Sequence, residues 1–129
     1  MTLIIGIDPG SRMTGYGIIS TDNDKLSFLD AGTIRTSSTD ITERIAQIFA
    51  GVSRIVTHYQ KTSATPLQDA IAQVFMASNP DSALKLGQAR GAAIAALTAL
   101  DLQVSEYTAR QIKQAVCGYG AADKEQVTA

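Results

Sequence analysis

The strongest constraint on the fold is a short apolar run at the start of the chain. Leu3-Ile-Ile-Gly-Ile7 is continuous and is followed at once by Asp8-Pro9-Gly10. An apolar run of this length that ends in a turn signal is typical of a strand buried on both faces. We therefore predict a central strand that ends at Asp8.

The next segments predict two more strands, a helix and a further strand. Residues 14–20 and 25–34 flank the polar cluster Thr21-Asp-Asn-Asp24, which indicates an antiparallel meander. From Asp40 the apolar residues recur at three- and four-residue steps, as on one stripe of a helix, and Asp40 with Glu43 resembles a capping box. Residues 70–75 form a short apolar stretch between polar loops, which predicts a second buried strand. The helical stripe consists of Ile41, Ile45, Ile48, Val52, Ile55 and Tyr59.

A second helix is predicted from Asn79 to about Leu100. Asn79-Pro80-Asp81 combines a capping side chain, a proline at the first helical position and an acid in the first turn. Small residues recur every four positions along this helix and allow another backbone to approach closely. We expect the neighbour to be either the sheet of the same chain or the same helix of a second copy. The small residues are Ala83, Gly87, Gly91 and Ala95.

The rest of the sequence predicts a brief strand at 102–104, a helix from Thr108 to about Val116, a turn at 118–120 and a helical start near Asp123. This order of elements indicates an α/β fold, a mixed sheet flanked by helices, in one domain over residues 1–129. A last helix of under two turns is too short to be stable alone, so we expect the C-terminal helix to be cut short.

Composition narrows the functional classes. The net charge of −1 argues mildly against a nucleic-acid-binding domain, so a DNA site has to be a local patch. Basic residues do cluster late in the chain, although scattered solvated charges are the plain alternative. A single cysteine excludes an intramolecular disulfide, and no apolar stretch is long enough for a membrane span, which together predict a cytoplasmic protein. The basic residues are Lys85, Arg90, Arg110, Lys113 and Lys124.

Asp8 is the first candidate for chemistry. Ligand sites in sheets of this kind gather at the carboxyl ends of central strands, where Asp8 is predicted to lie. The alternative is that Asp8 only initiates a hairpin turn, and spacing alone leaves both readings open.

Five ordered motifs resemble the RuvC-type Holliday-junction resolvases. They cover nearly the whole chain and are specific in their length and order. The motifs are Ile4-Ile-Gly-Ile-Asp-Pro-Gly-Ser-Arg-Met-Thr-Gly-Tyr-Gly-Ile18, Gln73-Val-Phe-Met76, Asn79-Pro-Asp-Ser-Ala-Leu-Lys-Leu-Gly-Gln-Ala-Arg-Gly91, Glu106-Tyr-Thr-Ala-Arg-Gln-Ile-Lys113 and Gly118-Tyr-Gly120.

The resemblance implies an RNase H-like mixed five-stranded sheet and a homodimer that cuts four-way DNA junctions symmetrically in recombination and repair. It also implies hydrolysis with two Mg²⁺ ions held by four carboxylates, and a branch-migration complex, RuvA-RuvB, as partner. Mg²⁺ prefers hard oxygen ligands, and two ions stabilise both the attacking and the leaving oxygen.

The carboxylate set departs from the family pattern. Asp8 matches the first family carboxylate, but Ala72 stands where the family has glutamate. Asp69 lies three positions before Ala72, so we expect it to point away from Asp8 unless a bulge changes the register. The helix that carries the last two family acids does not appear in this sequence. We therefore expect the chain as given to bind junctions without cutting them.

Further site residues follow from the resemblance. A phenylalanine at the position of Phe75 stacks on unpaired junction bases, in line with the use of aromatic side chains as base platforms; a core phenylalanine is the alternative. Lys113 and Lys124 match positions that hold phosphates or offset transition-state charge. Independently of the resemblance, Arg12 lies just past the Asp8 turn and is a candidate contact for DNA phosphates, with a solvated hairpin arginine as the alternative. Lys85 and Arg110 are further candidate contacts. The small-residue stripe is the candidate dimer interface.

Two other classes remain open. An actin-like ATPase or kinase also begins with a strand ending in Asp-x-Gly, but such enzymes need two such domains and the chain contains one hairpin of this type. A non-catalytic DNA-structure-binding module is the other alternative, which the missing acids favour.

Overall fold

The computed structural model describes residues 2–23, 25–62, 67–74 and 79–108. In chain order the elements are β1 (Thr2–Asp8), β2 (Met13–Asp22), β3 (Lys25–Arg35), α1 (Ile41–Thr62), β4 (Leu67–Val74), α2 (Pro80–Ala99) and β5 (Gln103–Thr108). The predicted order is confirmed as far as β5. That strand extends to Thr108, where we had predicted the start of a helix. The remainder of that helix, the turn at 118–120 and the last helical start lie outside the described residues.

The sheet is mixed and β1 is its central strand, as predicted. The five strands follow the order β3-β2-β1-β4-β5. β1 pairs antiparallel with β2 and parallel with β4, and β2 pairs antiparallel with β3. β4 pairs parallel with β5, which completes the sheet. Both parallel connections pass through a helix, as a parallel crossover requires.

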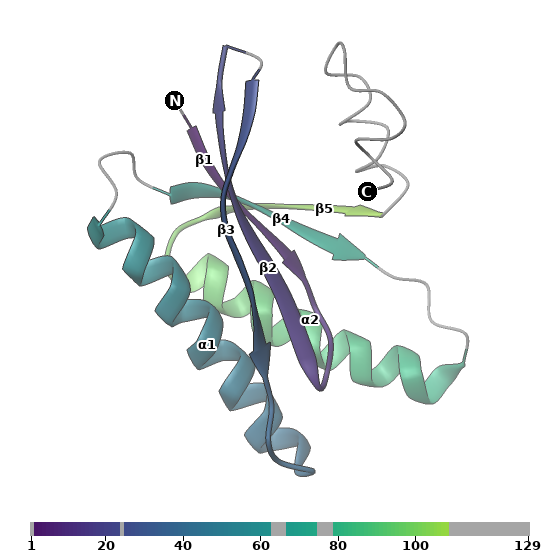
Figure 1. The fold of residues 1–129 in the computed structure, drawn as a ribbon. Helices are drawn as coiled ribbons and strands as arrows, with labels where there is room; N and C mark the ends of the chain where they lie inside the picture. The colour runs from purple at the N-terminus through teal and green to yellow at the C-terminus, as the bar shows by residue number, and fades with distance from the viewer. Residues whose placement is uncertain (1, 24, 63–66, 75–78, 109–129) are drawn as a thin grey trace.

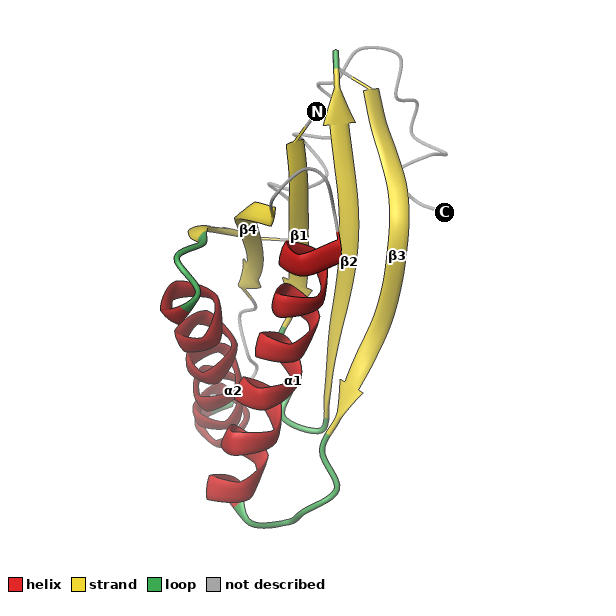
Figure 2. Cartoon of the chain, turned by 90° about the vertical axis from the view of Figure 1, so that its left-hand side faces the viewer, coloured by secondary structure: helices red, strands yellow, loops and turns green. Residues whose placement is uncertain are grey.

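Both helices cover the same face of the sheet (Figure 1, Figure 2). On β1 that face carries Leu3, Ile5 and Ile7, each at most 2% exposed, whereas Ile4 and Gly6 on the other face are only half-buried. The prediction that β1 is buried on both faces is therefore wrong for the described part of the chain. A continuous apolar run does not reveal this, because Ile4 is apolar whichever face is covered.

α1 begins at a cap that differs from the predicted capping box. Asp40 Oδ1 accepts a hydrogen bond from the Thr42 N–H (3.0 Å). The backbone N–H of Asp40, however, donates to Ser38 Oγ (3.0 Å) instead of bonding to Glu43. In a capping box a glutamate side chain accepts the N–H of the capping residue; here the side chain of Ser38 accepts it.

α1 is tied to the outer strand β3 by one hydrogen bond and one close approach. The Tyr59 hydroxyl donates to Asp30 Oδ2 (2.7 Å), and this bond is the main reason that the pKa of Tyr59 rises to about 12. Eight residues earlier, Gly51 lies so close to β3 that a Cβ there would be 2.6 Å from Cγ2 of Ile34. These contacts set the distance between α1 and the sheet.

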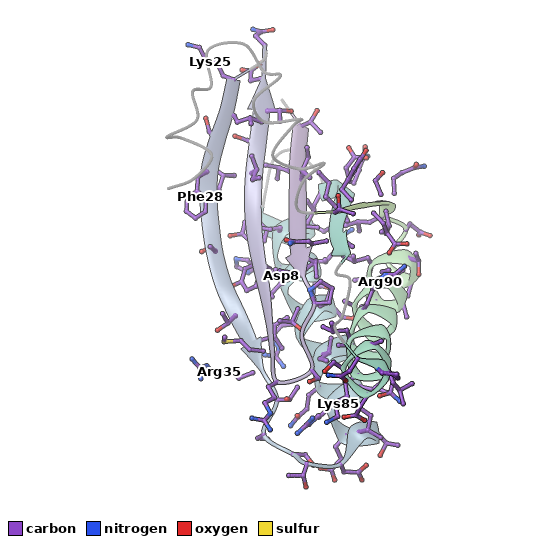
Figure 3. All side chains as sticks on the ribbon, turned by 90° about the vertical axis from the view of Figure 1, so that its right-hand side faces the viewer. Asp8, Lys25, Phe28, Arg35, Lys85 and Arg90 are labelled. Carbon is purple, nitrogen blue, oxygen red and sulfur yellow. The ribbon has the colours of Figure 1, made fainter. Side chains whose placement is uncertain are left out.

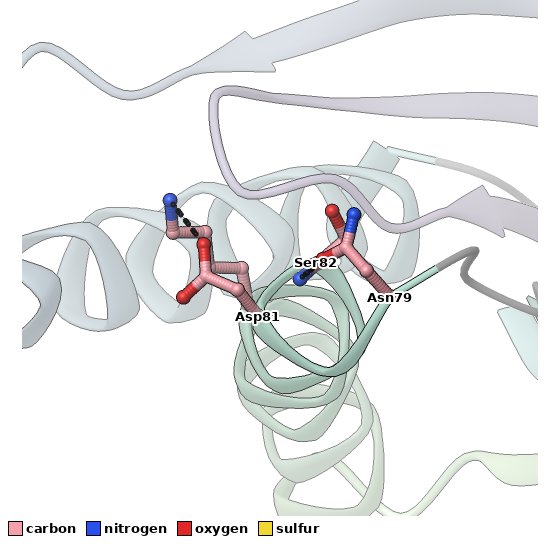
Figure 4. Close-up of polar contacts among 4 residues, drawn as sticks. Asn79, Asp81 and Ser82 are labelled. Carbon is pink, nitrogen blue, oxygen red and sulfur yellow. Dashed lines mark hydrogen bonds and ion pairs between the residues drawn. The ribbon is translucent and has the colours of Figure 1, made fainter.

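The start of α2 is confirmed in detail (Figure 4). Asn79 Oδ1 accepts the Ser82 N–H at 2.9 Å, and Pro80 occupies the first turn. The face of α2 that packs against α1 and the sheet is built from alanines and one leucine: Ala89, Ala92, Ala93, Ala96 and Leu97. Alanines let the helix approach the sheet closely, so the small-residue contact with the sheet exists but uses a different stripe from the predicted one.

A pair of glycine substitutions tests this packing. Gly51→Ala and Gly87→Ala both place a methyl group inside a helix, but the space around Gly87 is open within 4 Å. We expect Gly87→Ala to raise the free energy of unfolding by about 0.5–1 kcal/mol through helix propensity. The free energy of unfolding of Gly51→Ala should be about 1–3 kcal/mol lower than that of Gly87→Ala, because the added methyl group meets Ile34. Urea unfolding measures both, and equal stabilities would contradict the close contact.

Candidate functional site at the end of the central strand

Asp8 is the last residue of β1 and borders a hollow on the face that the helices leave open. The hollow has a volume of about 320 Å³, and its lining includes Ile4, Gly6, Ile71 and Gln73 as well as Asp8. Partial removal of water by these mostly apolar neighbours raises the pKa of the Asp8 carboxyl. Asp8 is thus an exposed acid with partly apolar surroundings, and it lies at the strand end where it was predicted.

The turn after Asp8 is held by two hydrogen bonds between the Thr14 side chain and the Gly10 backbone. Thr14 is fully buried, and its hydroxyl donates to the Gly10 carbonyl oxygen (3.0 Å) and accepts from the Gly10 N–H (3.3 Å). A Cβ on Gly10 would lie 2.3 Å from the Met13 carbonyl oxygen, so the turn has no room for a side chain there. The hairpin therefore fixes the direction in which the strand presents Asp8.

Ala72 lies next to the site but on the buried side of the sheet. It is 0% exposed and pairs with Ile7 on one side and Glu106 on the other. Paired residues of adjacent strands point to the same face, so Ala72 shares the helix-covered face with Ile7. Its neighbour Gln73 lines the Asp8 hollow instead. Gln73 was not among the predicted site residues, although strand alternation from Ala72 is a sequence signal that indicates it.

The expectation that Asp69 points away from Asp8 is wrong. Asp69 pairs with Ile4, and a register shift separates this pair from the Leu3–Leu67 pair. Residues 4, 6 and 8 share a face, so Asp69 and Asp8 lie on the same side of the sheet. Four residues of strand still separate them, roughly 13 Å at 3.3 Å per residue. Asp69 is therefore too distant to share a metal ion with Asp8.

The described residues do not fit a two-metal centre. No group of three or more His, Cys, Asp or Glu side chains lies close enough together in this part of the chain to hold a metal ion. Mg²⁺ bound through one carboxylate would keep most of its water ligands. Asp8 is the only family-matched acid that the described structure places at the site.

Two of the predicted DNA contacts, Arg12 and Lys85, are exposed within the described residues. Arg12 is exposed in the hairpin that follows β1. Lys85 is exposed near the start of α2 and forms an ion pair with Asp81 (3.3 Å) (Figure 3, Figure 4). An exposed pair of this kind is weak, so Lys85 remains available to another anion. The other predicted contacts, Phe75, Arg110, Lys113 and Lys124, lie outside the described residues.

A profile of the family described as crossover junction endodeoxyribonuclease RuvC matches residues 4–129. The chain belongs to the RuvC family. This match favours the resolvase resemblance over the actin-like alternative. Among the described residues, no helix is long and apolar enough to cross a membrane.

Named relatives support the assignment along almost the whole chain. The RuvC crossover junction endodeoxyribonuclease of Psychrobacter cryohalolentis is 68% identical over 127 residues, which cover 98% of this chain and 66% of the relative. The corresponding protein of Acinetobacter baumannii is 71% identical, with 98% and 67% covered. This RuvC-family chain thus spans about two thirds of the length of these relatives.

A solved structure matches the fold as well. The RuvC of Thermus thermophilus in complex with a Holliday junction substrate is similar with a TM-score of 0.77 and 27% sequence identity. The match covers 98% of this chain and 74% of that one. The expected α/β fold of the RuvC type is confirmed.

The predicted dimer stripe of this RuvC-family chain faces outward. Ala83, Gly87, Gly91 and Ala95 are all exposed on α2, and no atom of the described residues outside the helix backbone lies within 4 Å of a Cβ built on Gly87 or Gly91. The alternative in which this stripe packs on the sheet of the same chain is therefore wrong. The alternative in which it meets a second copy remains a prediction.

One ion pair near the site was not foreseen. Arg90 on α2 donates from Nε to Glu106 Oε2 on β5, and this bond raises the pKa of Arg90 further. Glu106 is the carboxylate beside Ala72 in the sheet, but its partner is a guanidinium. The pair connects α2 to the edge strand and leaves Arg90 less available to DNA than the sequence indicated.

The raised pKa of Asp8 predicts a pH-dependent effect of Asp8→Asn. The folded state holds the proton more tightly than the unfolded state, so the ionised carboxylate lowers stability above its raised folded pKa. Asp8→Asn should therefore raise the melting temperature slightly at pH 7. The gain should shrink as the pH falls through the folded pKa and vanish below the unfolded value near 3.8. Thermal unfolding between pH 7 and 3 tests this, and a gain that grows toward acid pH would contradict it.

Proposed function

We propose that this chain is the body of a structure-selective endonuclease that binds four-way DNA junctions as a homodimer during recombination and repair. The observation that carries the proposal is the family match over residues 4–129. It is supported by the similar Thermus thermophilus RuvC, which was solved with a Holliday junction substrate. The position of Asp8 at the end of the central strand, with the exposed Arg12 in the hairpin that follows, agrees with such a site.

The family activity is hydrolysis of phosphodiester bonds with two Mg²⁺ ions, with Asp8 as one metal ligand. We propose that this chain as given binds junctions without cutting them. Ala72 offers no oxygen ligand, and the described residues contain no group of three or more His, Cys, Asp or Glu side chains that could hold a metal ion. The same observation favours the second candidate function, a non-catalytic DNA-structure-binding module.

The remaining site roles are part of the proposal. Arg12, Lys85, Arg110 and Lys113 contact the DNA backbone, and Phe75 stacks on bases opened at the junction. Lys113 and Lys124 offset charge near the scissile phosphate. The partner is the branch-migration complex RuvA-RuvB, and the compartment is the bacterial cytoplasm.

The dimer contact is proposed along the exposed stripe of α2. A two-fold axis there would place two identical sites on the two strands of a symmetric junction. Glycine at positions 87 and 91 leaves the helix backbone accessible, so a second α2 can approach closely.

A salt-titrated gel shift in EDTA tests the proposed function. A synthetic four-way junction and a linear duplex of equal length are compared at several salt concentrations. We expect preference for the junction and an affinity that falls with salt, because counterions are released when phosphates are neutralised. Equal binding of junction and duplex at low salt would contradict the junction proposal.

The same samples with Mg²⁺ in place of EDTA test the separation of binding from cutting. We expect the junction to be retained uncut, because one carboxylate does not assemble a two-metal site. The full-length Acinetobacter baumannii relative serves as the control for an intact enzyme. Symmetric incision by this chain would overturn the proposal that it does not cut.

The dimer contact predicts different effects for two matched substitutions. Gly91→Glu places a charge in the exposed stripe of α2, and Ala46→Glu places the same charge on an exposed position of α1. We expect both variants to fold, but only Gly91→Glu to shift the sedimentation coefficient from dimer to monomer. Identical sedimentation of the two variants would place the dimer contact elsewhere.

A further inference from the structure

A second hollow lies beside the Asp8 hairpin and is lined by three arginines. It is formed where the β1–β2 hairpin, the end of β3 and the first turn of α1 meet, and its volume is about 420 Å³. Its lining contains no carboxylate. The lining residues are Arg12, Met13, Arg35, Thr36, Ser37, Ser38, Thr39 and Arg44.

The charges of these arginines are not neutralised within the described part of the chain. The two ion pairs found there, Lys85–Asp81 and Arg90–Glu106, involve neither Arg12, Arg35 nor Arg44. The acids nearest to these arginines in sequence are Asp8, Asp30, Asp40 and Glu43, and none of them lines the hollow. Asp40 Oδ1 already accepts the N–H and the hydroxyl of Thr42. The lining of the hollow therefore carries three positive charges and no carboxylate.

Hydrogen bonds hold the walls of the hollow in place. The Thr36 N–H donates to the Arg12 carbonyl oxygen (3.0 Å), and the Thr36 hydroxyl donates to the Ser11 carbonyl oxygen (2.8 Å). Gln47 of α1 accepts the Ser37 N–H (3.1 Å) and donates to Ser37 Oγ (2.9 Å). Because the backbone is fixed before any ligand binds, less conformational entropy is lost on binding.

The donors left over suit a phosphate group. Arg44 uses Nε to bond the Ser38 carbonyl oxygen (2.7 Å), which orients the guanidinium while its terminal nitrogens still carry four N–H donors. Ser37 Oγ and Ser38 Oγ act as acceptors inside the protein, so their hydroxyl protons remain to be donated. Arginine forks together with hydroxyl groups are the side chains that most often contact DNA phosphates.

A third hollow extends this surface along α1 and the edge strand β3. It has a volume of about 560 Å³, and Arg35 and Arg54 line it together with Gln47 and Tyr16. Arg35 lines both hollows, so Arg12, Arg44, Arg35 and Arg54 form a continuous arginine track. A track fits a polymer of phosphates better than one small anion.

We propose that the arginine track binds the phosphate backbone of a DNA duplex arm and leads it away from Asp8 past the edge of β3. The inference rests on the proposed function and assigns it an additional contact surface. Arg35 and Lys85 lie on either side of Asp8 toward one end of the molecule (Figure 3). The track thus holds DNA on the α1 side of Asp8, opposite the Lys85 side.

Salt-dependent binding of Arg35→Gln tests the track. Fluorescence anisotropy with a labelled four-way junction and a labelled duplex is measured in EDTA at several salt concentrations. The slope of log K against log salt is negative, and removing one phosphate contact reduces its magnitude by about 0.9. We expect this decrease for Arg35→Gln. The double variant that combines Arg12→Gln with Arg35→Gln should show roughly twice the decrease. Arg35→Lys keeps the charge and should recover most of the slope.

Lys25→Gln is the matched control. Lys25 lies on the same strand as Arg35 but at the opposite end of the molecule, and its substitution removes the same charge (Figure 3). We expect its salt slope to equal that of the unsubstituted chain, with the same melting temperature confirming that each variant is folded. Equal slopes for Arg35→Gln and Lys25→Gln on both DNAs would overturn the track.

The two DNAs separate this proposal from the proposed function. Backbone contacts are independent of sequence, so removal of the track weakens duplex and junction binding alike. A chain that binds both DNAs equally and has a lower slope in Arg35→Gln contradicts the junction function and supports the track. A chain that prefers junctions but is insensitive to Arg35→Gln supports the junction function and contradicts the track. A chain that binds neither DNA contradicts both the junction function and the track.

Discussion

The structure depends on the pairing of β1 with a neighbour on each side. β2 pairs with it antiparallel and β4 parallel, so the strand is held by backbone hydrogen bonds on both edges. Because α1 and α2 cover one face, Leu3, Ile5 and Ile7 anchor the core, and the alternate residues reach the open face. The same alternation that buries Ile7 presents Asp8 in the adjoining hollow. The packing of the core and the exposure of Asp8 both follow from the alternation of side chains along β1.

Under the proposed function, DNA binding and DNA cutting place different requirements on the residues around Asp8. Binding a DNA backbone needs accessible cations at fixed positions. The hairpin, the end of β3 and the start of α2 carry the exposed Arg12, Arg35 and Lys85, and the start of α1 carries the half-buried Arg44. Cutting by two metal ions needs several carboxylates within a few ångströms of one another. The described residues contain no group of three or more side chains that could hold a metal ion. Glu106, which pairs with Ala72 in the sheet, forms an ion pair with Arg90.

Small residues have three different uses in this chain. Gly10 allows the turn after Asp8 to close, because a Cβ would strike the Met13 carbonyl oxygen. Gly51 and the alanines of α2 bring the helices close to the sheet and to each other. Gly87 and Gly91 do neither within the described part of the chain, where no atom outside their own helix backbone lies within 4 Å of a Cβ built on them. One residue type therefore serves turn geometry, internal packing and an exposed backbone, and only the neighbours distinguish these uses.

The sequence alone determined the order of elements, the central position of β1, the cap of α2 at Asn79 and the placement of Asp8 at a strand end. Each of these follows from local signals: apolar period, turn residues and capping side chains. The tertiary structure decided which face of β1 is covered, that Asp69 shares a face with Asp8, and that Arg90 pairs with Glu106. It also decided that arginines from the hairpin, the end of β3 and α1 line two neighbouring hollows. These depend on register and on which segments meet in space, and residues distant in sequence carry no local signal of such contacts.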